Sequence, residues 1–229
     1  MGPDRQLEGL SLVCRRFLST KEWANVQTVP RKHTSLNGVL DEFRRFAADA
    51  FGLNEWNDDN GLRAPGHLKA RRHDKRAILH PISSEAERSW TPGKDIIVAR
   101  RLRAMGYDPT FALSLDERAQ WQPLLAQAHA DQVEATSIEG VATAIYESSW
   151  FIGTDSSIGH LASCCGLPTV TIADRPRNMF RGRSAWADNI VAWPWWLPLR
   201  TLRRKYWRQA TTVTLVIRSF SRIVRRRDS

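Results

Sequence analysis

Short apolar runs alternate with helical patterns through the middle of the chain. Strand-like runs, bounded by Pro, Gly or polar residues, predict strands at 76–81, 107–115, 150–153 and 168–173. Apolar residues at helical spacing predict helices between them at 92–106, 116–129, 138–149 and 157–165. Strands that alternate with helices are typical of βαβ units, so we expect an α/β fold with a Rossmann-like parallel sheet flanked by helices.

The pattern differs before this region. Residues 36–53 have one apolar face at helical spacing, with Gly52 suited to the end of the helix, and predict a single amphipathic helix. Residues 54–75 are polar, contain Gly and Pro, and predict a linker, whereas 1–35 are too mixed to assign. We therefore expect an N-terminal part at 1–75, the Rossmann-like domain at 76–198 and a C-terminal tail at 199–229.

The tail carries the charge of the protein. Ten Lys or Arg residues lie between Arg200 and Arg227, which accounts for about the whole net charge of +10. Apolar residues are interleaved with them, so one or two basic amphipathic helices are expected. Such helices can lie on an anionic membrane surface, or they can be ordinary solvated helices. Nucleic acid is the less favoured partner, because phosphate binding does not need an apolar stripe.

Composition limits the class of protein. The chain has 229 residues, enough for a sizeable core, and no apolar run as long as the roughly 18 residues that a membrane span needs. Its three cysteines form neither a disulfide framework nor a metal-binding pattern. We expect a cytoplasmic protein that needs no metal and no cofactor. If the tail binds lipid, the protein would also lie peripherally on the inner face of the cytoplasmic membrane.

The most distinctive stretch is FIGTDSSIGHLA at 151–162. An apolar strand runs into Asp155, Ser156 and Ser157, where the next helix begins. The first amides of a helix have no intrahelical acceptor and can bind phosphate oxygens, and hydroxyl groups add donors. Asp155 would accept hydrogen bonds from sugar hydroxyls or orient a cation. The alternative interpretation is that Asp155 or Ser156 only caps the helix, with His160 on its surface.

Two longer segments resemble a known family. HPISSEAERSWTP at 80–92 and SIEGVATAIYESSWFIGTDSSIGHLASCCGLPTVTI at 137–172 are similar to the nucleotide-sugar-binding half of ADP-heptose:lipopolysaccharide heptosyltransferases, glycosyltransferase family nine. The hallmark of that family is a strand followed by Asp-Ser/Thr-Gly, two variable residues and His-Leu-Ala, then Gly-x-Pro-Thr-Val. The resemblance implies one half of a GT-B fold, which has two Rossmann-like domains, and here an incomplete N-terminal domain.

The resemblance also implies roles for individual residues. Those expected near the diphosphate and the transferred sugar are Ser83, Ser84, Arg88, Asp155, Ser156, Ser157 and His160. Arg88 stands near a family lysine that neutralises the diphosphate. Thr136 and Ser137 lie where the family packs the base, and Glu117 is a candidate for the ribose hydroxyls. Arg88 and Glu117 can equally be solvated charges at helix ends.

The implied activity is glycosyl transfer without a metal. A heptose-like sugar would pass from a nucleoside diphosphate donor, an ADP-sugar, to lipopolysaccharide or another lipid-linked glycan. The alternative is a non-catalytic nucleotide-sugar-binding remnant or partner subunit.

Two features depart from the family pattern. Ser157 replaces the usual glycine, and only about 75 residues precede the half-domain, whereas the family has an acceptor-binding half there. The general base that transfer requires is not identified, and a partner chain is one way to supply an acceptor domain.

Overall fold

The computed structural model describes residues 44–45, 47–49, 51–53, 55, 59–83, 85–176 and 187–228. The chain divides into two compact units, Met1–Asp58 and Asp59–Ser229. In the first unit, residues 44–45, 47–49 and 51 are helical, and Gly52 follows with a φ of +68°. This agrees with the end of the helix predicted at 36–53: Gly52 and Leu53 lie beyond the helix, and the other residues of that range lie outside the described part.

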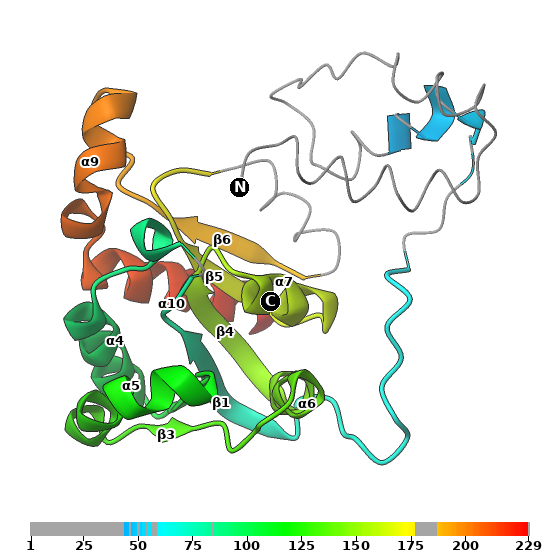
Figure 1. Ribbon diagram of the computed structural model, residues 1–229, viewed down its shortest axis with the longest axis horizontal. Coiled ribbons are helices and arrows are strands. Elements are labelled where there is room, and N and C mark those ends of the chain that lie inside the picture. The colour runs from blue at the N-terminus through cyan, green and yellow to red at the C-terminus, as the bar shows by residue number, and fades with distance from the viewer. Residues whose placement is uncertain are drawn as a thin grey trace. The chain divides into compact units, whose positions relative to one another are not determined.

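The second unit is a six-stranded parallel sheet with helices on both faces (Figure 1). The strands are β1 (His73–His80), β2 (Asp108–Phe111), β3 (Asp131–Gln132), β4 (Ser148–Thr154), β5 (Thr169–Ile172) and β6 (Asn189–Ala192). The helices are the 3₁₀ turn η1 (Ala86–Arg88), α4 (Pro92–Ala104), α5 (Leu115–Ala128), α6 (Ile138–Glu147), α7 (Ser157–Cys164), α9 (Arg200–Ala210) and α10 (Val213–Asp228).

The strand order is β3-β2-β1-β4-β5-β6, and every pair is parallel. This is the doubly wound order, in which successive strands move outward from β1 in one direction and then from β4 in the other. The order reverses between β1 and β4, where the two central strands lie side by side and His80 pairs with Gly153. The predicted fold class is confirmed, and the reversal marks where such a sheet opens a crevice at its carboxyl edge.

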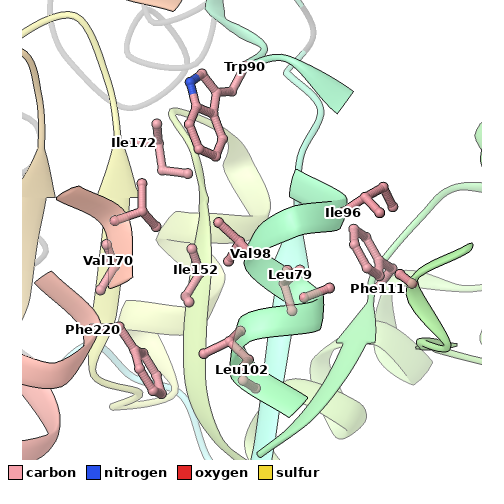
Figure 2. Packing of buried hydrophobic residues seen from close by; sticks show 14 of the residues in the cluster. Leu79, Trp90, Ile96, Val98, Leu102, Phe111, Ile152, Val170, Ile172 and Phe220 are labelled. Atoms are coloured by element: carbon pink, nitrogen blue, oxygen red, sulfur yellow. The ribbon is translucent and has the colours of Figure 1, made fainter. Parts of the chain in front are cut away.

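Alternate residues of the central strands point to opposite faces, each covered by its own helices. Leu79 and Ile152 belong to the larger core cluster, with α4, α5 and α10 (Figure 2), whereas Ile78 and Phe151 belong to the smaller one, with α6 and α7. Both faces are covered, so the central segments of β1 and β4, residues 77–79 and 150–152, are runs of consecutive buried apolar residues, as expected of a parallel sheet.

The structure extends the predicted elements in three places. β1 begins at His73, within the segment predicted as a linker at 54–75, because its first residues are polar and lie at the amino end of the strand. β3 has only two residues and β6 has four, and neither was predicted. The two residues of β3 are too few to establish an apolar pattern, and β6 is the edge strand, which its pairing with β5 defines.

The predicted basic tail is part of the folded unit. Of α10, Val216, Phe220 and Ile223 are at most 1% exposed and pack in the larger core cluster against the sheet. The apolar stripe expected to face lipid is therefore buried within the protein along α10. Only the α9 part of that stripe is exposed, through Leu199, Leu202 and Tyr206. Within the described ranges, none of the helices combines the length and the apolar character required to span a membrane.

Candidate functional site

Side chains join the carboxyl ends of β1 and β4. The Ser83 hydroxyl donates to the backbone oxygen of Asp155 at 2.9 Å, and the Thr154 hydroxyl donates to the backbone oxygen of Ile82 at 3.2 Å. Gly153 allows the strands to meet, because a Cβ there would lie 2.7 Å from the His80 carbonyl oxygen. These contacts fix the loop after β1 and the loop after β4 in position relative to each other.

The helix start at this edge retains amides that can receive a ligand. Ser156 is the N-cap of α7, and its hydroxyl accepts from the amide of Gly159 at 3.3 Å. The amides of Ser157 and Ile158 have no acceptor among the described residues. Ser157, which stands where the family has glycine, is exposed and is not among the residues with a left-handed backbone. A serine therefore causes no backbone strain at this position.

Arg88 faces this corner from η1. Its Nη1 lies 3.7 Å from Oδ2 of Asp155, and its Nε lies 2.9 Å from Oε2 of Glu85. The Asp155 side chain is 6% exposed, whereas that of Arg88 is 37% exposed. The carboxylates thus orient the guanidinium while leaving part of it accessible to a ligand, and a guanidinium can form two parallel hydrogen bonds to a phosphate.

A cavity of about 690 Å³ opens beside Arg88 and Asp155. The end of β5 and the residues after it, from Ile172 to Arg175, line the cavity, and residues of α9 form a further wall. Seven basic side chains and four acidic ones line it: Arg88, Arg175, Arg200, Arg203, Arg204, Lys205 and Arg208, against Glu85, Glu87, Asp155 and Asp174. The excess of positive charge favours an anionic ligand.

Hydrogen bonds attach the end of α9 to the segment that carries Arg88. The Lys94 ammonium donates to the carbonyl oxygens of Arg208, Gln209 and Thr211 at 2.6, 2.9 and 3.0 Å. The Trp90 indole also donates to the Arg208 oxygen at 3.1 Å, and the Arg208 guanidinium donates to the Ala86 oxygen at 2.6 Å. These bonds satisfy carbonyl groups that a helix C-terminus leaves without partners, and they keep the α9 wall against the Arg88 corner.

The predicted donor-side residues come together only in part. Arg88 and Asp155 line the cavity. Ser83 follows β1, Ser156 caps α7 and Ser157 begins it, and these three serines are not among the lining residues. His160 lies within the first turn of α7 and is half-buried. Ser84 lies outside the described residues.

The predicted base and ribose residues make local contacts in this structure. Glu117 accepts a hydrogen bond from the Ser114 amide at 2.8 Å and so caps α5. Ser137 is the N-cap of α6, where its hydroxyl accepts from the Gly140 amide at 3.2 Å. Thr136 precedes it and is exposed. The capping contacts account for Glu117 and Ser137 without a ligand, and their roles toward a nucleotide stay a prediction.

Sequence reasoning missed the α9 wall as part of the site. Its cations were assigned to a separate tail, because the pattern of charge along a helix does not reveal what the helix faces. Arg118 was missed as well: its guanidinium donates to the carbonyl oxygens of Val133 and Ala135 and so holds the loop that precedes α6. Within the described residues, no group of three or more His, Cys, Asp or Glu side chains could hold a metal ion.

Comparison with known proteins shows likeness at the level of the fold. No family model matches the sequence, and the search of curated proteins finds no significant match. Among solved structures, the chain is similar to a family 9 glycosyl transferase from Veillonella parvula, with a TM-score of 0.65, 14% identity, and coverage of 85% of this chain and 62% of the other.

Two heptosyltransferases from E. coli are also similar. For the heptosyltransferase WaaC with ADP, the TM-score is 0.59 at 14% identity, covering 80% of this chain and 56% of that one. For ADP-heptose lps heptosyltransferase II, the TM-score is 0.54 at 16% identity, covering 71% and 50%. The chain thus spans about half to three fifths of the length of these structures, and it shares with these glycosyltransferases an α/β fold with a parallel central sheet.

Proposed function

We propose that this chain is the nucleotide-sugar-binding part of a glycosyltransferase. Its fold is that of glycosyltransferases, one of which was solved with ADP, and its cavity opens where a doubly wound sheet takes ligands. The observation that carries the proposal is the pairing of Arg88 with Asp155 at 3.7 Å, beside the unoccupied amides that begin α7. This arrangement combines a cation and backbone donors at one corner.

The corner suits a diphosphate attached to a sugar. The amides of Ser157 and Ile158 would donate to one phosphate and Arg88 to the other, since anions bind at helix starts and to guanidinium groups. Asp155 repels phosphate but can accept hydrogen bonds from sugar hydroxyls while it orients Arg88. The donor that we propose is an ADP-sugar, heptose-like in its sugar part.

The same groups can assist the reaction. When the glycosidic bond to the donor breaks, negative charge increases on the departing diphosphate, and Arg88 with the α7 amides would stabilise that charge. The acceptor hydroxyl needs a base within hydrogen-bond reach on the other side of the sugar. No described residue is assigned to that role. The acceptor that we propose is lipopolysaccharide or another lipid-linked glycan, and the second candidate function is binding of a nucleotide sugar without transfer.

Calorimetric titration with ADP tests the donor site. Arg88→Gln should weaken ADP binding about 10- to 100-fold, because a charge-assisted hydrogen bond contributes roughly 1.5–3 kcal/mol. The matched control is Arg72→Gln, an arginine that also pairs with a carboxylate, Glu147 at 3.9 Å, but at the amino end of β1. Equal loss in the two variants, or no ADP binding by the unmodified chain, would contradict the proposal.

Release of ADP separates an enzyme from a binding protein. An ADP-sugar is incubated with the chain in the presence and absence of a lipopolysaccharide acceptor, and free ADP is measured. Acceptor-dependent release supports transfer. Tight binding of ADP-sugar without such release supports the non-catalytic alternative.

A further inference from the structure

The α9 wall carries more positive charge than a diphosphate bound beside Arg88 would neutralise. Five of its eleven residues are basic and none is acidic: Arg200, Arg203, Arg204, Lys205 and Arg208. Arg200, Arg204 and Arg208 recur every four residues, so like charges share one stripe and repel one another. Arg200 also stands in the first turn, where the helix dipole disfavours a cation. This composition does not serve the stability of α9.

No carboxylate of the described residues pairs with these cations. The ion pairs of the described part involve other basic residues, for example Arg175 with Asp174 and Arg88 with Asp155. Arg203 donates to the Leu197 oxygen and lies 5.1 Å from the Trp193 ring, and Arg208 donates to the Ala86 oxygen. Arg200 and Arg204 are exposed, line the cavity and make no such contact among the described residues.

The stripe extends away from Arg88. Its Arg208 end is fixed beside η1 by the bonds to Ala86 and Lys94. The eight residues from Arg208 to Arg200 advance about 12 Å along the helix at roughly 1.5 Å per residue. A single diphosphate at the Arg88 corner is shorter than this and cannot neutralise both ends. The cavity therefore offers cations for a second anionic group.

We propose that Arg200 and Arg204 bind the phosphate groups of a second substrate, a phosphorylated sugar, while the nucleotide occupies the Arg88 corner. This inference rests on the proposed function, because it takes the cavity to be the donor site. The phosphates can belong to a free sugar phosphate or to a lipid-linked one, since a guanidinium recognises the phosphate oxygens in both. In either source, the stripe places the phosphorylated substrate across the cavity from Asp155.

The test is titration of the ADP-saturated full chain with glucose 1,6-bisphosphate, with glucose as the uncharged comparison. We expect the bisphosphate to bind in the presence of saturating ADP and glucose not to bind. Replacing Arg200 and Arg204 together by Gln should weaken bisphosphate binding by about tenfold or more, because charge-assisted hydrogen bonds are lost. The affinity for ADP should change less than about twofold, because neither side chain lies at the Arg88 corner.

A matched control variant removes the same charge elsewhere. Arg218 and Arg222 are also exposed arginines four residues apart, on α10, and do not line the cavity. Replacing both by Gln should leave bisphosphate binding unchanged. If this control weakens binding as much as the α9 variant, or if ADP displaces the bisphosphate completely, the proposed subsite is wrong.

Vesicles distinguish the source of the phosphates. Sedimentation with phosphatidylcholine vesicles that contain lipid A, a bisphosphorylated glycolipid, again with ADP present, reports a lipid-linked sugar phosphate. Bisphosphate binding that needs the α9 arginines identifies a free sugar phosphate, and vesicle binding that needs them identifies a lipid-linked one. If neither probe binds in a way that depends on Arg200 and Arg204, the inference is overturned. Failure of the proposed function is seen separately, as absence of ADP binding by the unmodified chain.

Discussion

At the scale of single residues, Asp95 is an ionisable group in an unfavourable, buried position. It lies in the first turn of α4, is 5% exposed, and its Oδ2 is buried without a hydrogen-bond partner. Burial raises the pKa of the Asp95 carboxyl well above its ordinary value, and the neighbouring Lys94 charge offsets this only partly. Because the folded state favours the protonated carboxyl, its stability falls as the pH rises from about 4.

Asp95→Asn should therefore stabilise the protein at neutral pH. Asn has nearly the same shape and no charge, so the gain should be present at pH 8 and should disappear toward pH 4, where both side chains are neutral. Urea denaturation at a series of pH values measures the difference in free energy of unfolding. Asp116→Asn, an exposed acid in the first turn of α5, is the control and should not stabilise at pH 8. A gain at Asp95 that is independent of pH would contradict this account.

Gly153 is a second residue at which the structure predicts the effect of a substitution. A Cβ at this position would lie 2.7 Å from the His80 oxygen and 2.8 Å from Cε1 of Phe151, and the carbonyl belongs to the paired strand, which cannot move without disturbing the sheet. Gly153→Ala should destabilise the fold by about 1–3 kcal/mol in urea denaturation. Gly93→Ala is the matched control: it lies in α4 with nothing within 4 Å and should stabilise slightly. Similar effects of the two substitutions would contradict the expectation.

The position of a residue in the fold could be predicted from the sequence where it depends on residues next to it in the chain. Asp155, Ser156 and Ser157 follow a strongly apolar strand, so their place at the carboxyl edge could be predicted from neighbours in the chain. The contact between Arg88 and Asp155 brings together two residues that the resemblance placed near one diphosphate, and their role toward a ligand stays a prediction. Glu117 illustrates the limit, because the same residue pattern describes a ribose-binding acid and a helix cap.

At the scale of elements, Lys94 connects α4 to α9. It is the donor to three carbonyl oxygens at the α9 C-terminus, and burial lowers the pKa of its ammonium group. Sequence periodicity cannot reveal this contact, since Lys94 and Arg208 are 114 residues apart. The helices at 199–227 were expected as a tail because their charges dominate the local pattern, whereas the residues that they pack against lie far away in the sequence, in α4, β5 and β6.

Lys94→Met should loosen α9 while the sheet stays folded. Loss of these charge-assisted hydrogen bonds should cost about 1–3 kcal/mol and should speed hydrogen exchange of the α9 amides more than that of the β4 amides. Lys69→Met, at an exposed lysine, is the control and should change neither. If Lys94→Met speeds exchange in β4 as much as in α9, the effect is global and the residue is not a local clamp.

At the scale of the whole molecule, α10 completes the larger core. Phe220 is fully buried and packs edge-on against Tyr107 and Trp150, with ring centroids 4.9 and 5.6 Å away. Arg227 also lies over the Trp150 ring at 4.8 Å. The alternation of strands and helices was enough to predict the parallel sheet, but α10, which covers the larger core together with α4 and α5, could not be recognised as a core helix from a segment so rich in arginine.

Removal of 213–229 should therefore prevent cooperative folding. The truncation exposes the apolar residues of β5 and β6 that α10 covers, and Phe220→Ala alone should cost about 3–5 kcal/mol. Thermal unfolding followed by circular dichroism measures both variants. The truncated chain should lack a cooperative transition, whereas a transition at the midpoint of the intact chain would show that α10 is dispensable for the core.

The juxtaposition of β1 and β4 also has a consequence for the rate at which the protein folds. Ser83 and Asp155, which join the loops after these strands, are 72 residues apart in sequence. Closing so long a loop has an entropic cost before any contact is gained, and proteins dominated by distant pairings fold slowly. The two central strands should therefore associate late. The chain has ten tryptophans, so the contribution of Trp150 on β4 is the difference in stopped-flow fluorescence between the chain and a Trp150→Phe variant. That difference should reach its native value in milliseconds to seconds, after the helical signal has developed.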